Sequence, residues 1–292
     1  MPKTSLIIPT FDRQKITFNT LVYLNNQTIK DFEVIVIDQT KSVSKDLENY
    51  IFNNGITKYK YFNIDKVGLP NARNVGARHA VSKILIYLDD DCIPENKLIE
   101  SYINIFDKQD PKVWCIGGRV IEKGSNIMRQ SDKILGGWVT WYGKTLKNFD
   151  SNETGLCQWA PGGNFAVKAD KFSAVGGFDE NYLGNAILED GDFGFNIINQ
   201  GGHVMYSPKP VMEHLRAQLG GTRKESASKG MFYRAHNTIY FLRKHKMRLR
   251  IFPALWYLLG VAVKDLIQGK HGFTAIFWTK IGFIKGFFTK PQ

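Results

Sequence analysis

Strand-like and helix-like patterns alternate over the first 91 residues, and this alternation constrains the fold more than any other feature of the sequence. The apolar, strand-like runs are Thr4–Pro9, Phe32–Ile37, Lys58–Ile64 and Lys83–Leu88. The helix-compatible segments between them are Arg13–Gln27, Ser42–Phe52 and Pro70–Val81. Such alternation predicts an α/β fold with a mostly parallel sheet covered by helices on both faces. In sheets of this kind the ligand cleft lies at the carboxyl ends of the strands.

Acidic residues follow two of these runs directly. Asp38 ends the second run, and Asp89, Asp90 and Asp91 end the fourth. Carboxylates at i and i+2 in an extended chain project to the same side, so Asp89 and Asp91 can converge on one hard cation, or divide between a cation and a ligand hydroxyl. A divalent metal held by one or two protein carboxylates keeps positions open for phosphate oxygens. The alternative is a solvated acidic turn or a helix cap.

A second acidic cluster, Glu189, Asp190 and Asp192, opens a predicted helix. The helix dipole favours acids there by about 0.3–1 kcal/mol each, but three acids exceed what capping requires. Upstream, the loop within residues 159–167 contains consecutive glycines, where backbone can approach a ligand closely. Downstream, His214 is either a structural residue or a metal ligand.

The basic excess of the chain is confined to its last quarter. Residues 215–292 hold 15 Lys and Arg against two acids, whereas the first 214 residues hold 24 against 25. This partition predicts two functional zones divided near residue 215. Three distant cysteines indicate neither a disulfide framework nor a zinc knuckle, and favour a reducing cytoplasm. The first apolar run is much shorter than a signal-peptide core, so we expect that the catalytic part is not exported.

The basic zone also contains apolar segments. Ile251–Val263 is uncharged but too short to span a bilayer, which takes about 20 residues. Phe273–Phe288 places its large apolar residues near one helical face. The basic residues that precede these segments are Arg243, Lys244, Lys246, Arg248 and Arg250. The combination predicts a peripheral membrane anchor. The alternative is a helical bundle packed on the catalytic domain. No nucleic-acid partner is expected, because the charges accompany aromatic, largely apolar stretches.

Six segments together resemble glycosyltransferase family two, inverting enzymes of the GT-A fold. They read SLIIPTFDR, FEVIVID, GLPNARNVG, LDDD, GGNFAV and EDGD, and they occur in the family's order from about Thr4 to His214. The resemblance implies a nucleoside-diphosphate sugar donor, a divalent metal, Mn²⁺ or Mg²⁺, and a hydroxyl acceptor on a glycan or lipid-linked molecule. It also implies a role in cell-surface polysaccharide or glycoconjugate synthesis. The rivals are a nucleotidyltransferase, which usually has a glycine-rich basic phosphate loop that is missing here, and an inactive membrane-associated scaffold, which should have lost acids that this chain retains.

The resemblance also assigns roles to individual residues. It implies that the donor contacts Pro9, Thr10, Asp12, Asp38, Arg73, Asn74, Asp89 and Asp90. It makes Asp190 the general base, and Asp91 and His214 the metal ligands. We further predict that the acceptor or the transferred sugar contacts Gly163, Asn164, Glu189 and Trp138. Members of the family often have an arginine a few residues after the second acidic motif. This chain lacks that arginine and has Asn196 in that neighbourhood. The resemblance therefore does not say which residue makes the donor-phosphate or helix contacts there.

These assignments define the expected organisation. Residues 1–214 form the catalytic domain, with a nucleotide-sugar-binding half at 1–91 and an acceptor and catalytic half at 92–214. Residues 215–292 form a basic helical region. Within the second half, residues 123–151 are the expected acceptor-facing insertion, since their aromatic side chains suit sugar rings or lipid; a packed loop is the alternative. We expect a cytoplasmic protein, peripherally associated with the inner face of the cell membrane.

Overall fold

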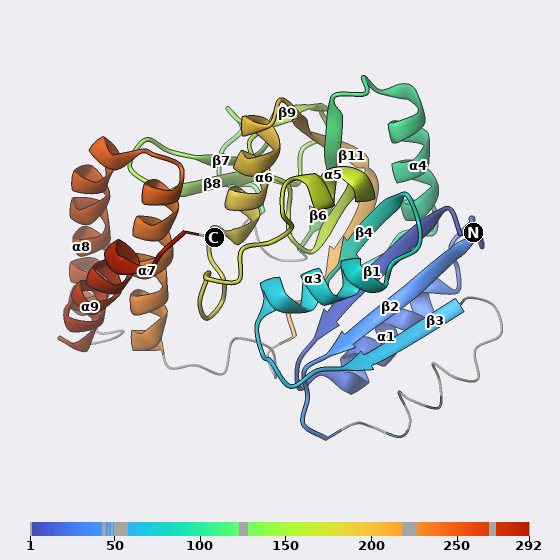
Figure 1. Ribbon diagram of the computed structural model, residues 1–292, viewed down its shortest axis with the longest axis horizontal. Coiled ribbons are helices and arrows are strands. Elements are labelled where there is room, and N and C mark those ends of the chain that lie inside the picture. Colours follow the sequence, from blue (N-terminus) through green and yellow to red (C-terminus); the bar gives the residue numbers. More distant parts are fainter. Residues whose placement is uncertain are drawn as a thin grey trace.

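One mixed sheet runs through the molecule and carries helices on both faces (Figure 1). The computed structural model describes residues 2–42, 58–122, 128–217, 227–268 and 273–291, with residues 45, 47 and 49. The strands follow the order β3-β2-β1-β4-β10-β6-β11-β5, with β9 paired to β11. Their bounds are β1 Thr4–Thr10, β2 Phe32–Asp38, β3 Lys58–Asn63, β4 Ile84–Leu88, β5 Cys92–Pro94, β6 Val113–Ile121, β9 Gly155–Cys157, β10 Asn164–Lys168 and β11 His203–His214. A separate hairpin pairs β7 Gly136–Val139 with β8 Thr145–Asn148.

The helices confirm most of the pattern expected from the sequence. Those of the first 214 residues are α1 Gln14–Leu24, α3 Leu69–His79, α4 Leu98–Lys108, α5 Ala169–Ala174 and α6 Glu189–Asn199. They are followed by α7 Ala227–Lys244, a 3₁₀ turn at Arg248–Arg250, α8 Ile251–Ile267 and α9 Thr274–Phe288. The predicted helix at Ser42–Phe52 falls mostly outside the described residues. The predicted α/β class is therefore confirmed.

Strand direction brings three loops to one edge of the sheet. Strands β3, β2, β1 and β4 are parallel, β10 is antiparallel to both β4 and β6, and β11 is parallel to β6. The carboxyl ends of β4 and β11 and the amino end of β10 therefore share an edge. The three segments there are Asp89–Asp91 after β4, His214 at the end of β11, and the glycines before β10.

The register sets the neighbours at this edge. Asn164 pairs with Leu88, so that Gly163 lies opposite Asp89, and the Asp89 N–H donates to the Gly163 carbonyl at 3.1 Å. His214 pairs with Cys92, one residue beyond Asp91. Backbone pairing alone thus places the acids, the glycines and the histidine together.

A single hydrophobic core joins the catalytic strands to the C-terminal helices. Every residue of β1 and β2 is buried, as expected for parallel strands covered on both faces. The same cluster includes Ile239, Tyr240 and Phe241 of α7. The helices after residue 227 therefore pack on the catalytic domain, as the bundle alternative predicted.

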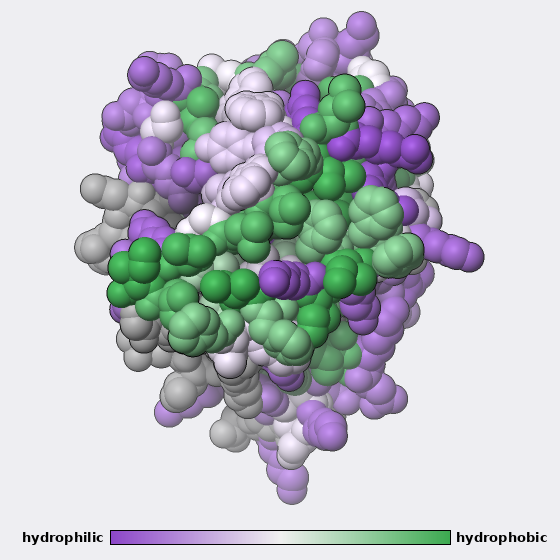
Figure 2. All heavy atoms as spheres, turned by 90° about the vertical axis from the view of Figure 1, so that its left-hand side faces the viewer, coloured by the Kyte–Doolittle hydropathy of each residue, from purple (hydrophilic) through white to green (hydrophobic). Residues whose placement is uncertain are grey.

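Helix α9 turns its small residues inward and its large residues outward. Its buried residues are Ala275, Thr279, Gly282 and Gly286. A Cβ at Gly282 or Gly286 would collide with backbone carbonyls of α7. The exposed large side chains of this end are Phe252, Trp256, Val263, Ile267, Phe273, Phe277, Ile284, Phe287 and Phe288, which we call the α8–α9 apolar face. Figure 2 shows it as a broad hydrophobic band. Within the described residues, none of the helices combines the length and hydrophobicity that spanning a membrane requires.

Candidate active site

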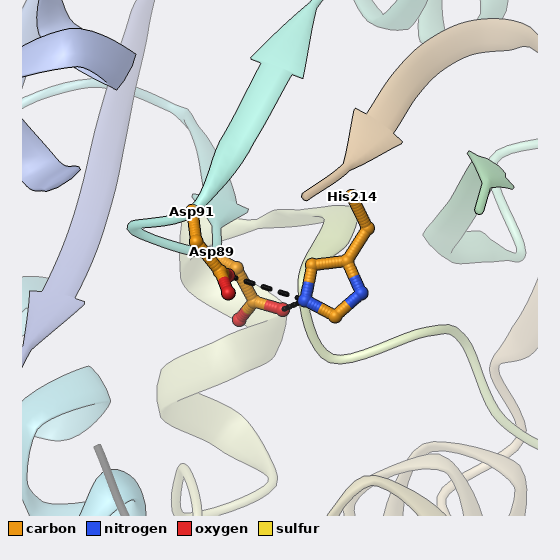
Figure 3. A group of neighbouring side chains, drawn as sticks. All are labelled: Asp89, Asp91 and His214. Carbon is orange, nitrogen blue, oxygen red and sulfur yellow. Dashed lines mark ion pairs between the residues drawn. The ribbon is translucent and has the colours of Figure 1, made fainter. Parts of the chain in front are cut away.

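Asp89, Asp91 and His214 form a compact group of electron-rich atoms (Figure 3). His214 Nε2 lies 3.1 Å from Asp91 Oδ1 and 3.9 Å from Asp89 Oδ2. One ligand atom from each residue falls within 4.8 Å of the others. Two carboxylate oxygens and an imidazole nitrogen are donors that Mn²⁺ and Mg²⁺ accept.

The surroundings of His214 favour a cation at this position. Its Nδ1 lies 2.9 Å from Glu122 Oε1, an arrangement that lets Nδ1–H donate and directs the Nε2 lone pair at the two aspartates. Burial would lower the pKa of His214, but the hydrogen bond to Asp91 and the charges of Asp89 and Asp91 raise it to about 9. Positive charge among the three donor atoms, from a proton or a metal ion, is therefore favourable, and the residues fit a metal.

Asp90 points away from this group. Its Oδ2 accepts from Thr10 Oγ1 at 2.7 Å, and its Oδ1 lies 3.1 Å from Arg13 Nη1. Burial and the charge of Asp91 raise the pKa of Asp90 to about 7, although Arg13 opposes this rise. Arg13 also lies 3.3 Å from Asp91 Oδ2. Arg13 is not among the residues predicted for the site, although it ends the segment SLIIPTFDR.

A cleft of about 180 Å³ opens beside the acids, between the loop after β1 and the start of α3. Its lining residues are Pro9, Thr10, Phe11, Arg13, Gln39, Val67, Gly68, Leu69, Asp89, Asp90, Asp91 and His214. We call it the donor cleft. Four of the predicted donor residues, Pro9, Thr10, Asp89 and Asp90, line it.

Two other predicted donor residues lie beside the donor cleft but do not line it. Asp12 is exposed in the loop after β1, with a positive φ of 53°. Asp38 is fully buried, and its carboxylate accepts hydrogen bonds from Gln14, Tyr61 and the Thr40 backbone. The next residue, Gln39, reaches the cleft instead.

A second hollow of about 300 Å³ lies on the other side of Asp89. Its lining includes Gly162, Gly163, Glu189 and Asp190, together with Thr145, Lys147 and Trp159 from the hairpin side. We call it the acceptor pocket. Leu69, Asp89 and His214 line both hollows, so two of the three members of the metal group stand on their common wall, and Asp91 lines the donor cleft.

Arg73 holds the acids of α6 in the acceptor pocket. Its Nη1 lies 2.5 Å from Glu189 Oε1 and 3.0 Å from Asp190 Oδ1, and its Nη2 donates to the Gly162 carbonyl at 2.9 Å. Arg73, which was predicted to contact the donor, lines the acceptor pocket and does not line the donor cleft. Burial raises the pKa of both Glu189 and Asp190, because the desolvation of these carboxyl groups outweighs the opposing charge of Arg73. Asp190 is the more exposed acid, with 26% of its side chain accessible against 3% for Glu189.

Consecutive glycines separate the two acidic groups. A Cβ at Gly162 would lie 2.5 Å from Asp190 Oδ1, and one at Gly163 would lie 2.1 Å from Asp89 Oδ2. Only glycine allows both carboxylates to approach the backbone this closely.

Three side chains that were predicted to contact a ligand line neither the donor cleft nor the acceptor pocket. Asn164 is fully buried, and its amide joins Tyr102 to the carbonyls of Arg119 and Pro210, so it holds strands together. Asn74 bonds both the N–H and the carbonyl of Phe178, and it therefore fixes a loop. Neither amide lines a hollow.

Trp138 is the third of these side chains. It pairs with Leu146, on the opposite face of the hairpin from Thr145 and Lys147. Its indole N–H donates to the Leu135 carbonyl at 2.7 Å. The tryptophan that lines the acceptor pocket is Trp159.

Lys244, the last residue of α7, and the next residue, His245, occupy the neighbourhood where the sequence offered Asn196. Lys244 Nζ lies 2.8 Å from Asp192 Oδ2 and 2.7 Å from Asp179 Oδ2, and His245 Nε2 lies 2.8 Å from Asp192 Oδ1. Asn196 only adds a 3.3 Å hydrogen bond to Asp192. Helix α6 is therefore clamped by the C-terminal region.

The fold matches solved structures of the GT-A type. A GalNAc-T7 structure with UDP, GalNAc and Mn²⁺ aligns with a TM-score of 0.64 at 18% identity, covering 83% of this chain and 48% of that one. The mannosyltransferase PcManGT from Pyrobaculum calidifontis, with GDP-Man and Mn²⁺, aligns with a TM-score of 0.61 at 15% identity, covering 98% and 86%. These likenesses establish the fold class.

The family follows from the sequence match. Residues 5–176, more than half of the chain, match Glycosyl transferase family 2, and the chain belongs to that family. A GalNAc(5)-diNAcBac-PP-undecaprenol beta-1,3-glucosyltransferase of Campylobacter jejuni is 30% identical over 137 residues. The match covers 44% of this chain and 42% of that relative, so the chain spans less than half of the relative's length.

Proposed function

We propose that the protein is an inverting, metal-dependent glycosyltransferase that moves a sugar from a nucleoside-diphosphate sugar to a hydroxyl of a glycan or lipid-linked acceptor. One observation carries the proposal: Asp89, Asp91 and His214 form one group, and two of its members, Asp89 and His214, stand on the wall shared by the two hollows. A metal held there would lie between a nucleotide in the donor cleft and an acceptor in the pocket that contains Asp190. The bound ions and nucleotides of the two GT-A structures support this assignment by analogy.

The residues divide the chemistry between them. Bound Mn²⁺ or Mg²⁺ would supply positive charge to neutralise the leaving nucleoside diphosphate. Asp190 would accept the proton of the acceptor hydroxyl, which attacks the donor sugar on the face opposite the leaving group, and this geometry inverts the anomeric centre. Arg73 would orient Asp190, and burial, which raises the pKa of that carboxyl, would make it a stronger base.

The direct test is slow hydrolysis of nucleotide sugars by the purified protein. We expect that one member of a panel of UDP-, GDP- and dTDP-sugars is hydrolysed with Mn²⁺ or Mg²⁺, and that chelation stops the reaction. The variant Asp91→Ala should lose metal-dependent donor binding and keep its circular-dichroism spectrum. Unchanged donor affinity of Asp91→Ala in the presence of Mn²⁺ would refute the metal assignment.

We also propose that the protein associates peripherally with an anionic membrane surface, at the inner face of the cell membrane, through the α8–α9 apolar face. Phe252, Phe273 and Phe288 are 68%, 80% and 75% exposed, which supports this proposal, because a monomer in water rarely keeps so large a contiguous apolar patch. Exposed Lys246 and Lys280 lie on the same helical region and suit anionic headgroups.

The structure changes how this association must be tested. Arg243 donates to the carbonyls of Gly286 and Thr289, and Lys244 pairs with buried acids, so neither is available as a surface charge. Replacement of all five basic residues before α8 would therefore damage the fold. A better variant changes Phe252 and Phe273 to Ser, both at exposed positions.

Co-sedimentation with vesicles of phosphatidylglycerol and phosphatidylcholine separates the alternatives. Wild-type protein should sediment with the vesicles, less so at high salt, because salt screens the lysines. The double serine variant should stay in the supernatant with its donor hydrolysis intact. Equal sedimentation of both proteins would contradict the proposal.

A further inference from the structure

Lys147 presents a positive charge to the acceptor pocket. It lies on β8, two residues from Thr145 on the same face of the strand, and both line the pocket with Asp190. Among the residues that the structure describes, no carboxylate lies within 4.0 Å of its ammonium group. The role of this lysine is not explained by the metal group or by the base.

The two acids whose charges act on Lys147, Glu122 and Asp190, already have partners. Glu122 Oε1 faces His214 Nδ1 at 2.9 Å and Arg216 Nε at 3.6 Å. Asp190 faces Arg73. Burial lowers the pKa of Lys147, and Arg216 adds to this effect, while Glu122 and Asp190 oppose it. The ammonium group has therefore lost part of its hydration without gaining an ion pair, a cost that a bound anion would offset.

Trp159 lines the acceptor pocket together with Lys147. Its cross-strand partner is Gly137, and the ring of Trp159 covers that glycine, since a Cβ there would enter the ring. An aromatic face suits the apolar face of a sugar ring. The pocket thus combines an aromatic wall, an ammonium group and the carboxylate of Asp190.

We infer that the acceptor is anionic, and that Lys147 binds a carboxylate or phosphate group carried by the acceptor sugar. The inference rests on the proposed function, because it takes the pocket of Asp190 as the acceptor pocket. It adds a substrate class: acidic sugars such as uronic acids, or phosphorylated sugars. The diphosphate of the donor is the competing source of negative charge, and Lys147 does not line the donor cleft.

Matched probe pairs test this inference. Methyl glucuronide is compared with methyl glucoside, and glucose 6-phosphate with glucose, by saturation-transfer NMR in the presence of Mg²⁺. The binding of UDP and of GDP is measured in separate, parallel titrations. Wild-type protein should bind the charged member of at least one pair about tenfold or more tightly, the usual worth of a charge-assisted hydrogen bond. Lys147→Met should abolish the preference, and Lys147→Arg should retain most of it. Lys144→Met on the same hairpin, at a position that does not line the pocket, is the matched control.

Three outcomes would overturn the inference. Equal binding of charged and neutral probes by the wild type would do so, as would a preference that survives in Lys147→Met. Weaker UDP or GDP binding by Lys147→Met would assign the lysine to the donor diphosphate instead. Donor hydrolysis needs no acceptor and is measured separately, so its absence would count against the proposed function while leaving the anion preference measurable.

Discussion

The two glycines before β10 allow the metal site and the base to be disabled separately. In Gly163→Ala the new Cβ would lie 2.1 Å from Asp89 Oδ2, whereas ordinary contact begins near 3.4 Å. The backbone at this position is fixed by strand pairing and by the hydrogen bond from the Asp89 N–H. The carboxylate of Asp89 must therefore move by about 1 Å or more, a displacement that can cost about 10²-fold in rate.

Gly162→Ala makes a different collision. Its Cβ would lie 2.5 Å from Asp190 Oδ1 and 2.5 Å from Arg73 Nη2, and it does not approach the metal group. We expect Gly163→Ala to raise the Mn²⁺ concentration for half-maximal donor hydrolysis by about tenfold or more, the effect typical of a disturbed metal shell. Gly162→Ala should lower the turnover of transfer and leave that concentration unchanged.

The assay is a manganese titration of donor hydrolysis and of transfer for both variants. Gly230→Ala in α7, where a Cβ would meet nothing within 4 Å, is the control and should match the wild type. Identical manganese curves for Gly163→Ala and the wild type would refute the placement of Asp89 at the metal. A shifted curve for Gly162→Ala would refute the separation of the two functions.

Two further predictions concern the base and the C-terminal clamp. Asp190→Asn should lower transfer by about 10²–10⁴-fold while donor binding survives, because the amide keeps the size of the side chain and loses the proton acceptor; wild-type turnover would contradict the assignment. Lys244→Met should lower the free energy of unfolding by about 3 kcal/mol, because the carboxylates of Asp179 and Asp192 are almost fully buried and would lose their shared cation. Urea denaturation measures this loss, with exposed Lys246→Met as the control, and equal midpoints for the two variants would show that the clamp is unimportant.

The parts of the site that the sequence predicted are those set by strand ends. Asp89 and Asp91 directly follow an apolar run, and His214 ends another strand, so parallel topology alone brings them to one edge. The glycine pair and the acids of α6 were visible for a similar reason, since each begins or ends an element. The convergence of these three side chains could be predicted because backbone topology determines it.

The remaining contacts depend on register and on packing between distant segments. A shift of one residue in a strand exchanges its faces, so the sequence could not show that Trp138 points away from the pocket and Lys147 into it. Asn74 and Asn164 have the polarity of ligand contacts, but both meet the need of buried backbone groups for hydrogen bonds.

In the C-terminal region, the number of basic residues did not predict which of them are exposed. Arg243, Lys244 and Lys246 are close together in the sequence, but only Lys246 is exposed to solvent. Arg243 closes the end of α9, and Lys244 pairs with acids 52 and 65 residues away in sequence. Composition showed the excess of basic residues, but it did not show which of them are paired inside the fold and which are exposed on the surface.

The inward and outward faces of α9 constrain the choice of residues independently. The inward positions, such as Gly282 and Gly286, tolerate no larger side chain, because the carbonyls of α7 lie directly against them. The outward positions, such as Phe277 and Ile284, are more than half exposed and contribute little to that packing. Substitutions at the outward positions can therefore accumulate without refolding the protein. The chemistry of this face can therefore change from one relative to another while the catalytic core stays constant.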